Sequence, residues 1–157
     1  MNRIYLDYNA TAPIRPGVQE AVAQALSFGN PSAVHAEGRR ARAAVEQARA
    51  QVAEFCGGAP EGVVFTSGGT EACNLALSLR AAPAGAIERV LVSATEHAAV
   101  RQAATASGLS VEELPVNRDG VIDLAALDGA LSTPAPALVC VMAANNCLLY
   151  TSDAADD

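Results

Sequence analysis

The chain has 157 residues, of which 51% are apolar and 4% aromatic, and its formal net charge is −7. This length suggests one domain or a piece of a larger one, and the apolar fraction is sufficient for a core. An acidic chain repels phosphate backbones, so nucleic acid is not an expected partner. All ten basic residues are arginine, so these residues supply neither a Walker lysine nor a Schiff-base amine.

The N-terminal part of the chain is predicted to be mainly helical. Residues 3–8 read as a short strand-like entry, and a helix begins at Pro16, a favourable residue for a first turn. Residues 29–35 form a loop rich in Gly, Asn and Pro, and a long helix then extends to about Cys56. One apolar stripe of that helix contains Ala41, Val45, Ala48, Val52 and Phe55.

The remaining chain alternates between strands and helices. Strands are predicted at 63–66, 89–94, 110–116 and 137–144, and helices at 71–80, 97–108 and 123–131. This alternation predicts an α/β fold with a largely parallel sheet. The longest apolar run, 137–144, is too short to cross a bilayer, and the N-terminus has no signal-peptide pattern. We therefore expect a cytoplasmic protein with no membrane partner.

Polar residues follow three of the predicted strands, at 67–70, 95–97 and 145–146. Because ligands bind at the carboxyl ends of parallel strands, we expect the three loops to converge on one crevice. Residues 67–70, Ser-Gly-Gly-Thr, open a helix, and free N–H groups beside glycines favour a phosphate there. The same residues are equally compatible with an ordinary strand-to-helix turn capped by Thr70.

Single residues of the other two loops have two interpretations each. His97 alone is more typical of an exposed helix start, but beside an anion site it could stack on a flat cofactor or move protons. Asn145 and Asn146 suit either a turn or a hydrogen bond to a ligand oxygen. His35 is expected in a surface loop.

The four cysteines contain no Cys-x-x-Cys pair, and only two histidines accompany them, so no metal site is predicted. The thiols are expected to be free in a reducing compartment. Cys56, Cys73 and Cys140 are expected to be buried rather than reactive.

Five segments stand in the order and spacing of the cysteine desulfurases: IYLDYNATAP, FGNPSAVHAEGRRAR, VVFTSGGTEACNLAL, SATEHAAV and VMAANN. Over residues 3–146 the chain resembles these pyridoxal-phosphate enzymes of the class V aminotransferase type, in the branch that serves nitrogen fixation and iron–sulfur cluster assembly. The resemblance implies a three-layer α/β architecture, the N-terminal part of the large domain of a fold-type I pyridoxal-phosphate transferase.

The resemblance also implies a reaction and roles for four residues. Such enzymes take sulfur from L-cysteine, release L-alanine and keep the sulfur as a persulfide. Gly69 and Thr70 would hold the phosphate of pyridoxal 5'-phosphate, His97 would stack on its ring and assist proton transfers, and Asn146 would bind the ring oxygen. A homodimer and a sulfur-accepting scaffold protein are the implied partners.

Several parts of the family pattern are missing from the chain. None of the 157 residues matches the family's Schiff-base lysine, its Asp and Gln cofactor contacts or its persulfide cysteine, so we expect this polypeptide to be inactive alone. Residues 1–146 are expected to form the family segment. Residues 147–157, which depart from the family's Glu-x-Gly pattern, are expected to be an artefactual, disordered tail.

Two alternative functions remain open from the sequence. One is another class V transferase such as a selenocysteine lyase. The other is a non-catalytic phosphate-binding α/β module.

Overall fold

The computed structural model describes residues 4–8, 10–78, 81–82, 85–145 and 148. The chain divides into two compact units, a helical unit of residues 1–65 and a sheet unit of residues 66–157. The boundary predicted between residues 146 and 147 lies outside the described residues, as does the predicted tail except for Leu148.

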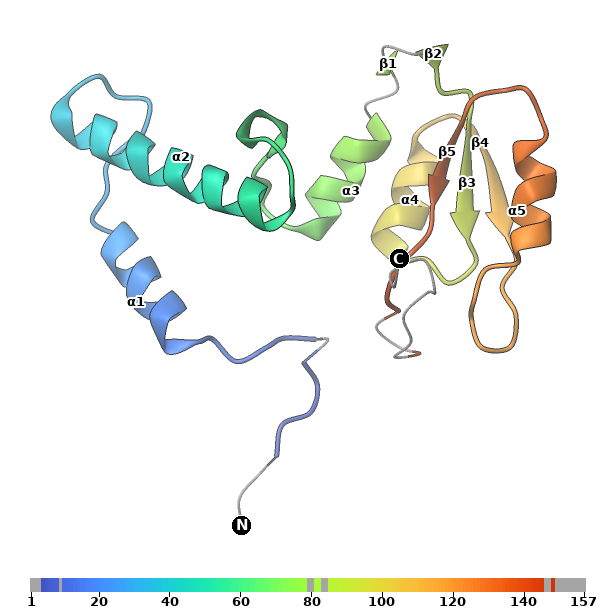
Figure 1. The fold of residues 1–157 in the computed structure, drawn as a ribbon, viewed down its shortest axis with the longest axis horizontal. Helices are drawn as coiled ribbons and strands as arrows, with labels where there is room; N and C mark the ends of the chain where they lie inside the picture. Colours follow the sequence, from blue (N-terminus) through green and yellow to red (C-terminus); the bar gives the residue numbers. More distant parts are fainter. Residues whose placement is uncertain (1–3, 9, 79–80, 83–84, 146–147, 149–157) are drawn as a thin grey trace. The chain divides into compact units, whose positions relative to one another are not determined.

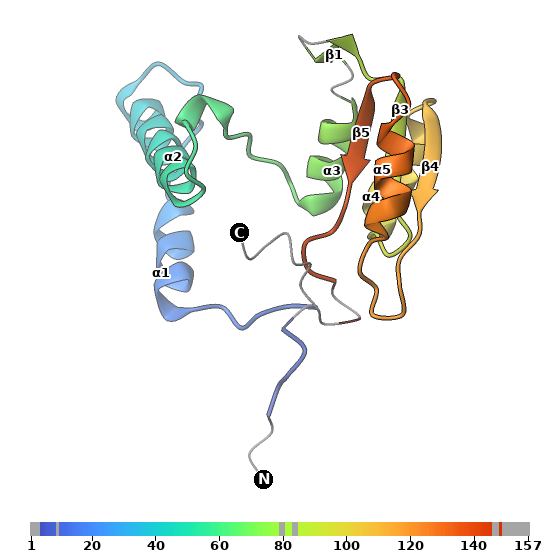
Figure 2. The same cartoon turned by 45° about the vertical axis from the view of Figure 1, so that its right-hand side comes forward.

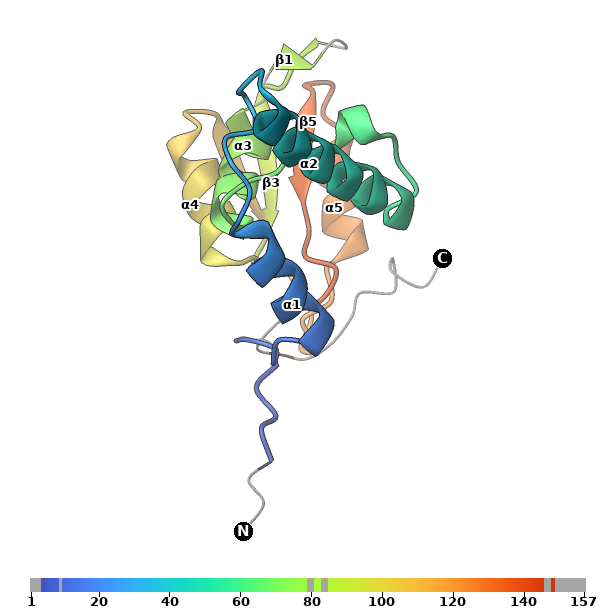
Figure 3. The same ribbon diagram turned by 90° about the vertical axis from the view of Figure 1, so that its left-hand side faces the viewer.

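The helical unit contains α1 (Pro16–Ala25), α2 (Ala36–Phe55) and the short 3₁₀ helix η1 (Pro60–Gly62), as Figure 3 shows. Pro16 opens α1, as predicted, because its fixed φ suits the first turn. The His35 side chain caps α2 by accepting a hydrogen bond from the Gly38 amide. Residues 4–8 are not a strand, since no described strand pairs with them.

The loop before α2 packs closely on the first turns of that helix. Arg42 donates to the Pro31 carbonyl at 3.1 Å, and Arg39 donates to the Val34 carbonyl at 2.6 Å. A Cβ atom at Gly38 would lie 2.8 Å from the carbonyl carbon and the Cβ of Ala33, and closer still to its oxygen. Only glycine therefore fits at position 38 without moving the loop.

The predicted apolar stripe of α2 is buried only in part. Ala41 is 3% exposed, whereas Phe55, at the end of the helix, is 92% exposed. Cys56 follows as the C-terminal cap and is exposed, so the prediction that it is buried is wrong. The helix ends here because Gly57 takes a φ of 67° and the Gly58 amide turns back to the Ala53 carbonyl.

The sheet unit contains a three-stranded parallel sheet in the order β4-β3-β5 (Figure 1). Val90 in the central strand lies opposite Val111 on one side and Leu138 on the other. The elements, in chain order, are α3 (Gly69–Ser78), the antiparallel pair β1 (Ala81–Ala82) and β2 (Gly85–Ala86), β3 (Arg89–Ser93), α4 (Ala98–Ala106), β4 (Ser110–Leu114), α5 (Leu124–Leu131) and β5 (Ala137–Cys140).

Helices cover both faces of this sheet, which gives three layers (Figure 2). Val90 and Val92 pack on one face with Leu77 of α3 and with Ala103 and Ala104 of α4. On the other face, Leu91 packs with Leu114 and with Ala130 of α5. Side chains alternate along a strand, so both faces of β3 are apolar because both are covered. The predicted α/β fold with a parallel sheet is confirmed.

Two predicted strands differ from the structure. Residues 63–66 are not a strand, because no described strand pairs with them, and Val64 remains 65% exposed. The last strand ends at Cys140 rather than at residue 144. Within the described residues, no helix combines the length and the apolarity that crossing a bilayer requires.

Candidate functional site

The polar loops of the sheet unit lie at the carboxyl ends of its strands. In Figure 1 the arrows of β3, β4 and β5 point the same way, and α3 and α4 both begin at the edge where these strands end. Thr70 is in the first turn of α3, His97 immediately precedes α4, and Asn145 follows β5. The first loop therefore reaches this edge although no strand precedes it among the described residues.

The start of α3 offers free hydrogen-bond donors. Ala72 is the first residue of the helix whose amide is bonded to the backbone, at 3.1 Å from the Gly68 carbonyl. Among the described residues, the amides of Gly69, Thr70 and Glu71 have no backbone acceptor. Nothing lies within 4 Å of a Cβ built on Gly68 or Gly69, so a ligand can approach this backbone closely. These donors and this open space suit an anion.

Glu71 organises the segment that precedes these donors. One of its carboxylate oxygens accepts hydrogen bonds from both the amide and the hydroxyl of Ser67, each at 2.6 Å. The Thr66 hydroxyl donates to the Gly68 carbonyl at 3.1 Å. The hydroxyl and then the amide of Ser67 lower the pKa of the Glu71 carboxyl, because both donate to its charged form.

We expect the Glu71 contact to make the start of α3 sensitive to acid. The folded pKa of Glu71 is depressed, so its contribution to stability is present above the unfolded pKa and is lost as the pH falls through the folded pKa. Carbon-13 NMR titration should find the Glu71 pKa below its ordinary value in the native chain and moved upward in Ser67→Ala. A Glu71 pKa that is unchanged by Ser67→Ala would contradict this assignment.

His97 is the N-terminal cap of α4. Its Nδ1 atom accepts a hydrogen bond from the Ala99 amide at 3.1 Å, and its own amide donates to the Glu96 carboxylate at 3.1 Å. Because Nδ1 is the acceptor, the neutral ring carries its proton on Nε2. The exposed ring can therefore present an Nε2–H group at the carboxyl edge of the sheet.

Asn145 connects the third loop to the second. Its Nδ2 atom donates to the Thr95 carbonyl at 3.0 Å, and its Oδ1 atom accepts from the Leu148 amide at 2.9 Å. The segments after β3 and β5 are thus in contact, as the predicted convergence of these two loops requires. Asn146, the predicted cofactor ligand, lies outside the described residues.

A groove of about 360 Å³ lies between α3, α4 and β5. Cys73 and Cys140 line it with Glu96 and apolar residues, and both thiols are only partly buried, less than predicted. Burial, and then the charges of Glu96 and Cys73, raise the pKa of Cys140. A raised pKa disfavours the nucleophilic thiolate, so Cys140 is not assigned a reactive role.

Two further predictions concern histidine and metal sites. His35 is exposed in the helical unit, where it caps α2 and lies 3.0 Å from Glu37. Over the part of the chain that the structure describes, no three His, Cys, Asp or Glu side chains are grouped so that they could hold a metal ion.

Comparisons with known proteins identify related chains. The family model described as aminotransferase class-V matches residues 4–151. A cysteine desulfurase from Frankia sp. (strain EuIK1) is 44% identical over 91% of this chain and 37% of its own length. The chain therefore spans well under half the length of this relative.

Solved structures give the same result. A NifS-like protein from Rickettsia africae ESF-5 matches with a TM-score of 0.80 and 31% identity, over 92% of this chain and 41% of that protein. A structure described as SspA in complex with cysteine matches with a TM-score of 0.78 and 32% identity, over 90% of this chain and 42% of the other.

Proposed function

Since the chain belongs to the aminotransferase class-V family, we propose that its carboxyl-edge loops bind pyridoxal 5'-phosphate as part of a cysteine desulfurase. The free amides at the start of α3 carry this proposal, because a helix N-terminus with open glycines suits a phosphate group. The name of the Frankia relative and the cysteine-bound SspA structure support L-cysteine as the substrate.

Each loop has a distinct task in this proposal. Gly69 and Thr70 hold the phosphate through their amides and the Thr70 hydroxyl. His97 lies against the pyridine ring and donates a hydrogen bond from its Nε2–H group while its Nδ1 stays bonded to the Ala99 amide. To assist proton transfers at Nε2, the ring must first release that amide and take up a proton at Nδ1. Asn146 is proposed to bind the ring oxygen. When bound, the cofactor supplies an electron sink, and the protein positions it.

The 157 residues contain no lysine, so this polypeptide supplies only part of a complete desulfurase site. We propose that it binds the cofactor without a lysine linkage and releases no alanine from L-cysteine by itself. Assembly as a homodimer, with a sulfur-accepting scaffold as partner, is proposed for the longer protein on the basis of the family resemblance.

Calorimetric titration with pyridoxal 5'-phosphate tests the phosphate contact. We expect inorganic phosphate to compete, and Thr70→Val to weaken binding about threefold to tenfold, because the variant keeps the β-branched shape but loses a hydroxyl donor. Thr105→Val is the matched control, since the Thr105 hydroxyl donates to the Arg101 carbonyl at 2.9 Å within α4. Equal affinities in the two variants, or no competition by phosphate, would refute this site.

A further inference from the structure

The loop of residues 94–97, which carries His97, is held by contacts from several elements. The Ala94 amide donates to the Leu114 carbonyl at the end of β4, at 2.9 Å, and the Glu96 amide donates to the Ser93 carbonyl at 3.0 Å. Ser93 is buried, with 2% of the residue exposed, and its hydroxyl lies 3.2 Å from the Thr95 hydroxyl. Backbone and side-chain hydrogen bonds to β3 and β4 therefore hold both ends of this loop.

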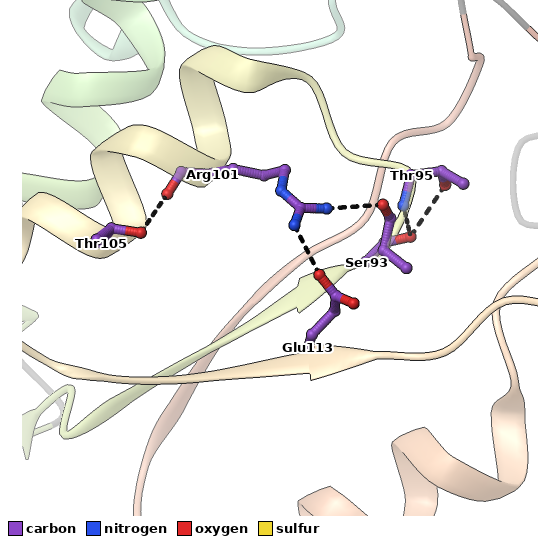
Figure 4. Close-up of polar contacts among 6 residues, drawn as sticks. Ser93, Thr95, Arg101, Thr105 and Glu113 are labelled. Carbon is purple, nitrogen blue, oxygen red and sulfur yellow. Dashed lines mark hydrogen bonds and ion pairs between the residues drawn. The ribbon is translucent and has the colours of Figure 1, made fainter.

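Arg101 contributes a charged contact to this loop from outside it (Figure 4). It lies one turn after His97 on α4, and its Nη1 atom donates to the Ala94 carbonyl at 2.8 Å. Its Nη2 atom donates to a Glu113 carboxylate oxygen on β4, also at 2.8 Å. The planar guanidinium thus connects α4, the 94–97 loop and β4 through two donors of fixed relative direction.

We propose that Arg101, oriented by Glu113, is a positioning residue that holds the 94–97 loop and so fixes the His97 ring at the carboxyl edge of the sheet. The functional importance of this ring rests on the proposed cofactor site, but the positioning itself does not. Loss of Arg101 frees the Ala94 carbonyl, which lies three residues before the histidine. The His97–Ala99 cap, the Ala94–Leu114 backbone bond and the Asn145–Thr95 bond then remain, but none of them holds the Ala94 carbonyl.

A second ion pair on β4 provides a matched comparison. Glu112 lies next to Glu113 in sequence and pairs with Arg89, the first residue of β3, at 3.7 Å. The side chains of Glu112 and Glu113 are 54% and 57% exposed, so both carboxylates face water to a similar extent. The Arg89 pair, however, is at the start of β3, whereas the 94–97 loop follows its end.

The positioning is tested without cofactor, by NMR on the full 157-residue chain. We expect Arg101→Met and Glu113→Gln to raise hydrogen exchange of the Ala94 and Glu96 amides about threefold to tenfold. Nitrogen-15 shifts of His97 should show less of the Nε2–H form than in the native chain. Glu112→Gln should change neither measurement. Arg101→Lys, which keeps the charge and one donor, should restore part of the protection.

Other outcomes would overturn the proposal. Exchange at Ala94 and Glu96 that is as slow in Arg101→Met as in Glu112→Gln would show that the loop does not depend on Arg101. A uniform rise over the whole sheet would show a general loss of stability instead. Should Arg101→Met fail to fold, Glu113→Gln gives the same comparison, and unchanged exchange there would refute the role of Glu113 in orienting Arg101.

A ligand titration separates this proposal from the proposed function. Arg101→Met should weaken the binding of pyridoxal 5'-phosphate about threefold or more but leave the binding of inorganic phosphate unaffected, since only the pyridine ring of the cofactor contacts His97 in the proposed site. Failure of the native chain to bind either ligand would refute the cofactor site and leave the exchange result to decide the positioning. An equal loss for both ligands would mean that Arg101 does not act through His97.

Discussion

Replacing Leu91 by alanine is expected to lower the free energy of unfolding of the sheet unit by about 2–5 kcal/mol. Leu91 is completely buried in the central strand and packs with Leu114 and Ala130, so its removal leaves a cavity between the sheet and α5. This loss is a large share of the ~5–15 kcal/mol that holds a typical domain folded. Urea denaturation followed by circular dichroism measures it.

Leu124→Ala is the control for this result. Leu124 opens α5 and is 69% exposed, so we expect its replacement to change stability by less than about 0.5 kcal/mol. If the Leu91→Ala and Leu124→Ala variants unfold at the same urea concentration, the result would contradict the packing of Leu91 between the sheet and α5.

Gly38→Ala should destabilise the helical unit by about 1–3 kcal/mol, although alanine is ordinarily the better residue for a helix. The added Cβ would overlap the backbone of Ala33, and a carbonyl group cannot move away as the tip of a side chain can. The loop before α2 would have to shift, with loss of the Arg39 and Arg42 contacts. Loss of helical signal in a thermal scan measures the effect.

Gly17→Ala shows what the same change does without a collision. Nothing lies within 4 Å of a Cβ at Gly17 in α1, so this variant should be as stable as the native chain or slightly more stable. If the Gly38→Ala variant has the same melting temperature as the Gly17→Ala variant, the loop before α2 is not packed on that helix.

Local patterns predicted the central strand of the sheet because that strand has a clear signature. Val90, Leu91 and Val92 form a continuous apolar run, which is typical of a strand covered on both faces. Residues 63–66, Val-Val-Phe-Thr, are also apolar and rich in β-branched residues, yet they are not a strand in the structure. Pairing depends on a neighbouring strand, and the composition of one segment does not say whether that neighbour is present.

The site was predictable as a set of loops but not as a set of contacts. The order of strands and helices indicated which polar residues lie at the carboxyl edge. Two contacts of the site could not be predicted from the sequence. The Asn145 amide binds the Thr95 carbonyl across 50 residues of chain, and the Arg101 guanidinium binds the Ala94 carbonyl seven residues away, from a helix to the loop before it. The Ser67–Glu71 contact has a signal in the sequence, because a spacing of four residues places a serine one helical turn from a glutamate.

The strand order β4-β3-β5 has a consequence for the route by which this chain folds. β3 can pair with β4 as soon as α4 has formed between them, but β5 must wait until the ribosome has synthesised about 45 further residues after β3. The contact between Asn145 and Thr95 is therefore among the last to close. The loops at 67–70 and 94–97 are synthesised before β4 and β5, so only the third loop of the carboxyl edge arrives after most of the core. A molecule that contacts all three loops would therefore select chains in which β5 has joined the sheet.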